Sequence, residues 1–173
     1  MHYVVLDLET LRSADDCRHC GREESLHYHG GACEEWTGER PPDTVQQFSG
    51  IGWDNKAALG LSIGCYWDSA TRGITFFDED TLEDTITHLV NSHPLLVSFN
   101  GIRFDGPLMR GILRRRAETM GNAEEQCRLT TLCNTFQSQW AFSYDILAEI
   151  WKLSPANKFT RGLNSLDAIA QAN

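Results

Sequence analysis

Two acidic residues at the end of one apolar run have the spacing of a metal-binding pair. Asp7 and Glu9 follow the run 3–6 and are separated by one residue. On a strand, which repeats every two residues, both side chains leave the same face. Carboxylates so close disfavour each other's ionised form unless cations neutralise them, and Mg²⁺ or Mn²⁺ is the kind of ion that they bind. The alternative is a strand that ends in two solvated acids.

A further acidic residue, Asp105, stands where a second apolar run meets a helix. Residues 95–99 lead into Asn100 and then Asp105, and a proline two residues later favours the first turn of a helix. Sites in open α/β sheets gather beyond the ends of central strands, so we expect Asp105 to lie near Asp7 and Glu9. In the alternative, Asp105 only stabilises the helix terminus and Asn100 is only a turn residue.

Basic residues lie close in sequence to Asp105. They are Arg103, Arg110 and the run Arg114–Arg116. Such residues contact a phosphate backbone in nucleic-acid-binding proteins, although a run of this kind is more often a solvated helix face. The net charge of −9 argues against binding a polyanion by bulk electrostatics. It is compatible with binding a polyanion only if metal ions and a local basic cluster supply positive charge.

A cysteine- and histidine-rich segment has the makings of a zinc site. Thiolates together with imidazole favour tetrahedral Zn²⁺, and Cys-x₂-Cys is a common first half of such a site. We expect a structural zinc ion, remote from the carboxylates, and the alternative is a loop with reduced thiols. The expected ligands are Cys17, Cys20, His29 and Cys33, with His27 or His19 as alternatives to His29.

The elements that must position these residues alternate between strands and helices. Periodicity predicts strands at 3–10, 57–67, 74–77 and 95–100, helices at 81–92, from Pro107 to about 120 and at 165–172, and a segment 143–150 that starts extended and turns helical. Residues 12–56 show no sustained period and are interpreted as an insertion. The order predicts one α/β domain over 1–173, a mixed sheet of about five strands flanked by helices.

Length and composition agree with a folded domain. The chain has 173 residues, of which 41% are hydrophobic and 23% charged. No run of 18 apolar residues is present, and the N-terminus lacks the pattern of a signal peptide. We therefore expect a cytoplasmic protein without a membrane partner.

Four segments together resemble the DnaQ-like (DEDD) exonuclease superfamily, in the YprB-like, predicted polymerase-associated branch. The first motif is Asp7-Leu8-Glu9-Thr10 and the second is Asn100 to Asp105, which matches Asn-Gly-x-x-Phe-Asp. The segments 144–147 and 163–170 are also similar to that branch. The resemblance covers about residues 1–11 and 57–173 and implies a ribonuclease H-like fold.

The resemblance implies a 3′–5′ exonuclease that hydrolyses phosphodiester bonds at a single-stranded DNA or RNA end by a two-metal mechanism. Asp7, Glu9 and Asp105 would hold two Mg²⁺ or Mn²⁺ ions, of which one activates water and the other steadies the leaving 3′ oxygen. Supporting roles fall to further residues. Asn100 and Asp145 would hold the metal ligands in position, and Thr10, Arg103 and Arg110 would contact nucleic acid.

The family's last motif, an Asp preceded four positions earlier by Tyr or His, has no match. Ala141 stands at that offset from Asp145, and Leu163 at that offset from Asp167. We expect the chain to end before this motif and its activity to be weak or absent, with Asp145 as a substitute ligand in the alternative. Two other readings stay open. One is a catalytically silent relative that binds nucleic acid or protein through the zinc loop, and the other is an unrelated α/β enzyme.

Overall fold

A five-stranded mixed sheet organises the molecule. The structure, a computed structural model, describes residues 1–14 and 51–153. The strands are β1 (Tyr3–Thr10), β2 (Leu61–Asp68), β3 (Gly73–Phe77), β4 (Leu95–Ser98) and β5 (Tyr144–Asp145). The helices are α1 (Lys56–Leu59), α2 (Leu82–Ser92), α3 (Asp105–Thr119), α4 (Ala123–Trp140) and α5 (Ile146–Leu153).

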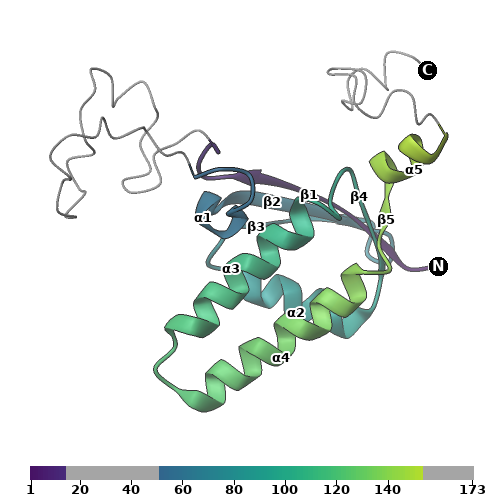
Figure 1. The fold of residues 1–173 in the computed structure, drawn as a ribbon. Helices are drawn as coiled ribbons and strands as arrows, with labels where there is room; N and C mark the ends of the chain where they lie inside the picture. Colours follow the sequence, from purple (N-terminus) through teal and green to yellow (C-terminus); the bar gives the residue numbers. More distant parts are fainter. Residues whose placement is uncertain (15–50, 154–173) are drawn as a thin grey trace, which may run out of the picture.

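The strand order is β3-β2-β1-β4-β5, with β1 in the centre. β1 runs antiparallel to β2 and parallel to β4, with Val5 opposite Val97. β2 and β3 form an antiparallel hairpin, and β4 runs parallel to β5. This arrangement confirms the predicted α/β class and mixed sheet, and it is compatible with a ribonuclease H-like fold. Because β1 and β4 are parallel, their carboxyl ends point to the same edge of the sheet (Figure 1).

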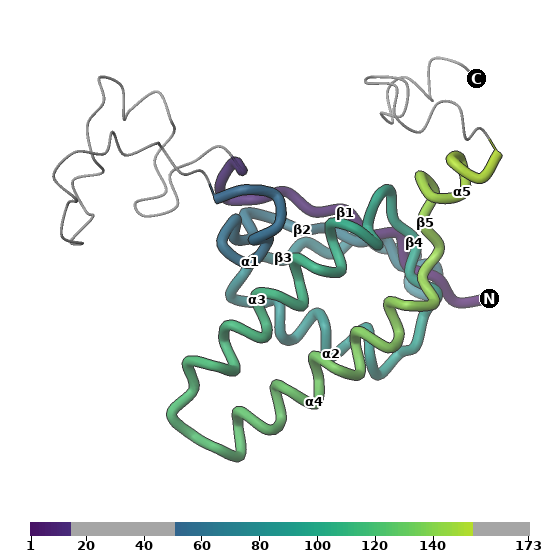
Figure 2. Tube along the Cα trace, in the orientation of Figure 1, coloured from purple at the N-terminus to yellow at the C-terminus, as the bar shows by residue number. Residues whose placement is uncertain are grey.

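Helices α1 to α4 lie on one side of the sheet, where the core forms (Figures 1 and 2). Alternation along β1 places Val4, Leu6 and Leu8 on the buried face. α2, α3 and α4 each contribute one apolar stripe to this core. Fully burying one large apolar side chain stabilises a fold by about 1.5–3 kcal/mol. The helical side chains with the least exposure include Ile86, Leu89, Leu108, Met109, Ile112, Leu129 and Phe136.

The opposite face of the sheet carries apolar side chains that the described residues leave open to solvent. Phe76 is 67% and Ile74 is 62% exposed on β3, and Ile63 on β2 is also exposed. Tyr3 and Trp67 contact each other on the same side, with ring centroids 5.5 Å apart. The sheet is therefore buried on one face only within residues 1–14 and 51–153.

Three predicted boundaries were wrong. Residues 56–59 form the helical turn α1 and are not part of a strand; β2 starts after Gly60, whose φ of 66° breaks the extended backbone. β4 stops at Ser98 because Asn100 has a φ of 64°, which a strand residue does not adopt. α3 starts at Asp105, so Pro107 occupies its first turn rather than its first position.

The longest helix, α4, was not predicted from the sequence. Its buried residues Leu129, Cys133, Phe136 and Trp140 recur at helical spacing, and Leu132 packs against the same core, but the other positions between Leu129 and Trp140 are polar. Asn122 caps the helix by accepting hydrogen bonds from the backbone N–H groups of Glu124 and Glu125. The expected helix at 165–172 and the cysteine- and histidine-rich segment lie outside the described residues.

Candidate functional site

Asp7 and Glu9 leave the same, exposed face of β1, as their spacing predicts. Asp7 lies opposite Cys65 of β2, and Glu9 lies opposite Ile63. The burial of the Cys65 thiol raises its pKa, and the negative charge of Asp7 raises it further. The two carboxylates therefore stand on the side of the sheet away from α2, α3 and α4.

Asp105 is a buried carboxyl group at the start of α3. Its side chain is only 3% exposed, and its Oδ2 atom has no hydrogen-bond partner among the described residues. Burial raises the pKa of Asp105 to about 8, and the nearby charges of Asp7 and Asp145 add to this rise. Asp7 thus lies close enough for its charge to disfavour the ionised form of Asp105, and this favours the protonated carboxyl group at neutral pH.

Gly101 makes the space in which the Asp105 carboxyl group lies. A Cβ atom on Gly101 would stand 2.9 Å from Asp105 Oδ2 and 2.5 Å from the Cβ of Ser98, with the Ser98 hydroxyl closer still. The Ser98 Oγ atom is also buried and without a hydrogen-bond partner in this part of the chain. Two buried oxygen atoms, Asp105 Oδ2 and Ser98 Oγ, therefore lie beside Gly101, and neither has a hydrogen-bond partner among the described residues.

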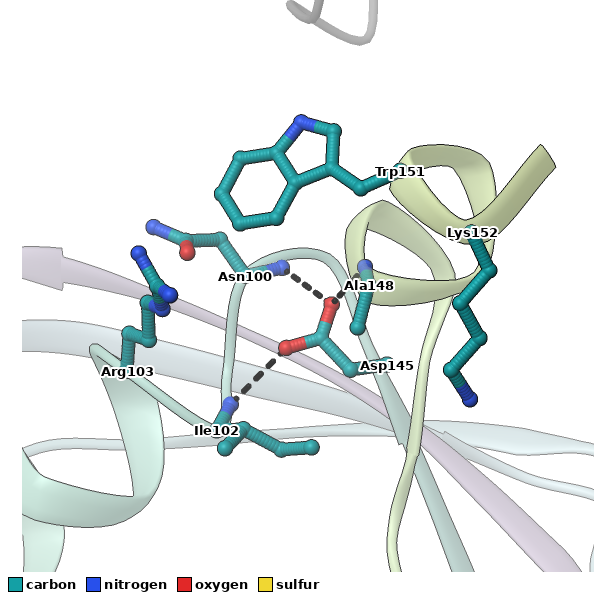
Figure 3. Close-up of a pocket in the computed structure, with 7 residues that line it drawn as sticks. All are labelled: Asn100, Ile102, Arg103, Asp145, Ala148, Trp151 and Lys152. Atoms are coloured by element: carbon teal, nitrogen blue, oxygen red, sulfur yellow. Dashed lines mark hydrogen bonds between the residues drawn. The ribbon is translucent and has the colours of Figure 1, made fainter. Parts of the chain in front are cut away.

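Asp145 fastens the loop between β4 and α3. Its Oδ1 atom accepts hydrogen bonds from the backbone N–H groups of Asn100 (3.0 Å), Leu147 (3.0 Å) and Ala148 (3.2 Å). Its Oδ2 atom accepts one from the N–H of Ile102 at 3.0 Å (Figure 3). The side chain is 4% exposed. Asp145 thus holds the loop that leads to Asp105 and also begins α5, and backbone donors use both of its oxygens.

A cavity of about 410 Å³ opens beside this loop (Figure 3). The guanidinium of Arg103 lies over the ring of Trp151, 5.0 Å from its centroid. The cavity lies between the loop that precedes α3 and the helix α5. Its lining consists of Asn100, Ile102, Arg103, Asp145, Ala148, Trp151 and Lys152.

The other basic residues are placed differently. Arg115 binds Glu79 and the carbonyl of Ala57, each at 2.7 Å, and Arg116 donates to the carbonyl of Glu79 at 2.7 Å. Both therefore tie α3 to its neighbours. Arg110 lines a separate cavity of about 230 Å³ between α3 and α4.

The remaining site residues divide into those that the structure places and those outside it. Thr10 is half-buried and pairs with Leu61 past an irregularity in the strand register. The expected zinc ligands Cys17, Cys20, His29 and Cys33, with the alternatives His19 and His27, lie outside the described residues. Sequence reasoning did not single out Ser98 or Trp151, because a serine at a strand end and a tryptophan in an apolar run carry no distinctive signal.

Within residues 1–14 and 51–153, no three His, Cys, Asp or Glu side chains lie together closely enough to form a ready-made metal site. Asp7 and Asp105 interact, but the structure does not gather Glu9 with them into such a group. The described residues thus bring together two of the three predicted ligands. A bound cation would give the buried Oδ2 atom of Asp105 the partner that it lacks among the described residues.

The comparisons with known proteins do not identify a family. No protein-family model matches the chain, and neither a curated protein nor a solved structure matches it. Among the helices in the described ranges, none combines the length and apolar character needed to cross a membrane.

Proposed function

We propose that the protein is a metal-dependent exonuclease that hydrolyses phosphodiester bonds at the 3′ end of single-stranded nucleic acid. The observation that carries this proposal is the pair formed by Asp7 and the buried Asp105. Burying a carboxyl group beside a second carboxylate is unfavourable unless a proton or a cation compensates it. Asp105 keeps a proton at neutral pH, and a divalent cation would replace that proton.

The residues around this pair fit a divalent-cation site. Asp7 and Asp105 would bind the ion, and Glu9, on the same face of β1 as Asp7, would supply further oxygens. Gly101 leaves room for the Asp105 carboxyl group, and Asp145 fixes the loop before it. Bound Mg²⁺ or Mn²⁺ would supply Lewis acidity, which activates water and offsets charge on the leaving oxygen.

The substrate class and the direction of digestion rest on the DnaQ-like resemblance. Asp7-Leu8-Glu9-Thr10 and the segment 100–105 are the motifs that carry it. The resemblance is supported by the parallel pairing of β1 with β4, because the two motifs lie at or after the carboxyl ends of these strands, on the same edge of the sheet. Neither Asp145 nor Asp167 has a Tyr or His four positions earlier to orient water, so digestion without that help would be slower, since general-base assistance contributes about 10²- to 10⁴-fold to a rate.

Two measurements test the proposal together. Mn²⁺ binding is followed by electron paramagnetic resonance, and digestion is followed with a 5′-labelled single-stranded oligonucleotide at stoichiometric protein. We expect bound Mn²⁺ and products shortened from the 3′ end. Asp7→Asn and Asp105→Asn should lose both, whereas Asp84→Asn, at an exposed position of α2, should lose neither. Wild-type protein that neither binds Mn²⁺ nor shortens the oligonucleotide would contradict the proposal.

A second candidate function is that of a catalytically silent relative of the exonucleases, which binds nucleic acid without cutting it. The lack of a ready-made group of three ligands in the described ranges favours this alternative. It predicts oligonucleotide binding that Asp105→Asn does not change, together with no digestion in Mn²⁺.

A further inference from the structure

Arg103 differs from the arginines that stabilise the fold. Arg115, Arg116 and Arg128 each pair with a glutamate side chain. Arg103 has no such carboxylate partner within the described ranges, and its guanidinium lies instead over the ring of Trp151. Stacking uses the face of the planar guanidinium and leaves its N–H groups, which lie in the plane, free to donate. Arg103 is therefore held in place with its donors available to an anion.

The cavity beside Arg103 has the size and lining of a small-molecule site. Its volume of about 410 Å³ falls within the roughly 300–1,000 Å³ of typical ligand pockets. Trp151 gives it an aromatic wall, and Asn100, from the same loop as Arg103, also lines it (Figure 3). Lys152 also lines the cavity, although its ammonium group pairs with Glu149 at 2.5 Å.

The one carboxylate in the lining does not oppose an anionic ligand strongly. Asp145 is buried, and its oxygens accept four backbone hydrogen bonds. Those donors already compensate much of its negative charge. The cavity therefore combines an anion-binding guanidinium, a flat aromatic wall and an amide that can donate and accept hydrogen bonds.

The position of the cavity indicates which ligand would enter it. Asn100 and Arg103 belong to the loop that leads into Asp105 at the start of α3, so the cavity lies near the proposed metal site. A ligand that joins a phosphate to a flat ring matches the guanidinium and the aromatic wall together. Proteins that bind single strands use this combination of cationic groups and stacking aromatic side chains.

We propose that this cavity binds one nucleotide of a single-stranded nucleic acid, with the base on Trp151, the phosphate on Arg103 and the Asn100 amide at the edge of the base or sugar. This inference rests on the proposed function for the class of ligand. Binding here does not require the metal ligands, so it can be tested without them.

The test uses a fluorescein-labelled oligothymidine in EDTA, where metal-dependent digestion cannot proceed. Binding is measured by fluorescence anisotropy. Stacking of one base is worth about 1–3 kcal/mol, so Trp151→Leu should weaken binding by about 5- to 150-fold. Trp151→Phe, which keeps an aromatic face, should retain most of the affinity. Arg103→Gln should also weaken binding and reduce its salt dependence, whereas Arg114→Gln, at an exposed position of α3, should change it little.

A photochemical measurement locates the contact in the wild-type protein. An oligonucleotide that carries 5-iodouracil is crosslinked by light, and the attached peptide is identified by mass spectrometry. A crosslink within residues 144–153 supports the proposal, and crosslinks confined to other segments overturn it. This result decides even if Trp151→Leu fails to fold. Wild-type affinity in folded Arg103→Gln and Trp151→Leu proteins would also overturn it.

The outcomes separate this inference from the proposed function. If the wild-type protein does not digest nucleic acid but the cavity variants bind it more weakly than the wild type does, the exonuclease proposal fails and the nucleotide site stands. If the wild-type protein digests DNA and the cavity variants bind normally, the nucleotide site alone fails.

Discussion

The carboxyl groups of Asp7 and Asp105, far apart along the chain, interact in the folded protein strongly enough that Asp7 helps to raise the pKa of Asp105. Burial is the larger cause, and the charge of Asp145 is a further one. The raised pKa of Asp105 should therefore affect the stability of the protein, its metal binding and its response to pH.

The stability of the metal-free protein should reveal the raised pKa of Asp105. Between the ordinary value of 3.8 and about 8, the unfolded chain has lost this proton while the folded protein keeps it. Folding therefore becomes less favourable as the pH rises through this window, by at most about 1.4 kcal/mol per pH unit. Asp105→Asn lacks the group, so urea unfolding should show it gaining stability over the wild type from pH 5 to pH 8. A constant difference would contradict the raised pKa.

Metal binding should release a proton below pH 8. Mn²⁺ needs the ionised form of Asp105, so its affinity should fall by up to about tenfold for each pH unit below that value. Calorimetry in two buffers of different ionisation enthalpy measures the proton directly. Equal heats in both buffers at pH 7 would mean that Asp105 is not a ligand.

Replacing Asp145 should destabilise the protein although this residue lies at the edge of the sheet. Asp145→Ala leaves four backbone N–H groups without their acceptor, and each one that stays buried costs about 1–3 kcal/mol. We expect a loss of roughly 2–4 kcal/mol, because some of these groups will reach water. Asp145→Asn keeps one acceptor and should lose less. Chemical denaturation measures both, with Asp84→Asn as the control, and equal stability of Asp145→Ala and wild type would contradict the assigned role.

A methyl group at Gly101 should disturb the candidate metal site. Its Cβ would press against Ser98 and the Asp105 carboxyl group. Such overpacking costs about 1–3 kcal/mol, and Mn²⁺ binding should weaken with it. Gly121→Ala is the matched control, because a Cβ there meets nothing within 4 Å. Unchanged Mn²⁺ affinity in Gly101→Ala would remove Asp105 from the site.

The zinc hypothesis, which rests on sequence alone, predicts one zinc ion per chain. Elemental analysis of protein purified without chelators should find it, and Cys20→Ser should lose it. Cys127→Ser is the control, because Cys127 is an exposed, free cysteine on α4. Full zinc content in Cys20→Ser would refute the proposed ligand set.

Periodic segments were predicted well because their side chains report directly on burial. The alternation in β1 and the stripe in α2 are each confirmed by the buried residues of those elements. α4 escaped prediction because its apolar side is narrow and the rest of the helix is largely polar; that side consists of Leu129, Leu132, Cys133, Phe136 and Trp140. Such a stripe becomes recognisable only once the surface that it packs against is known.

The site was only partly predictable for a related reason. Sequence placed Asp7 and Asp105 at one edge of the sheet, since that follows from strand direction. The role of Asp145 depends on where the loop after β4 passes β5, and that follows from tertiary packing. The contact between Arg103 and Trp151 likewise joins two segments that no local pattern connects.

The Asp145 hydrogen bonds also set an order of assembly. Asn100 and Ile102 receive their acceptor from a residue that follows them by 45 and 43 positions, beyond the whole of α3 and α4. A contact of such long range forms only after the intervening chain has closed on itself. During synthesis, the β2–β3 hairpin can pair early because its strands adjoin in sequence, whereas the loop that leads to Asp105 takes its final shape only once β5 has joined the sheet.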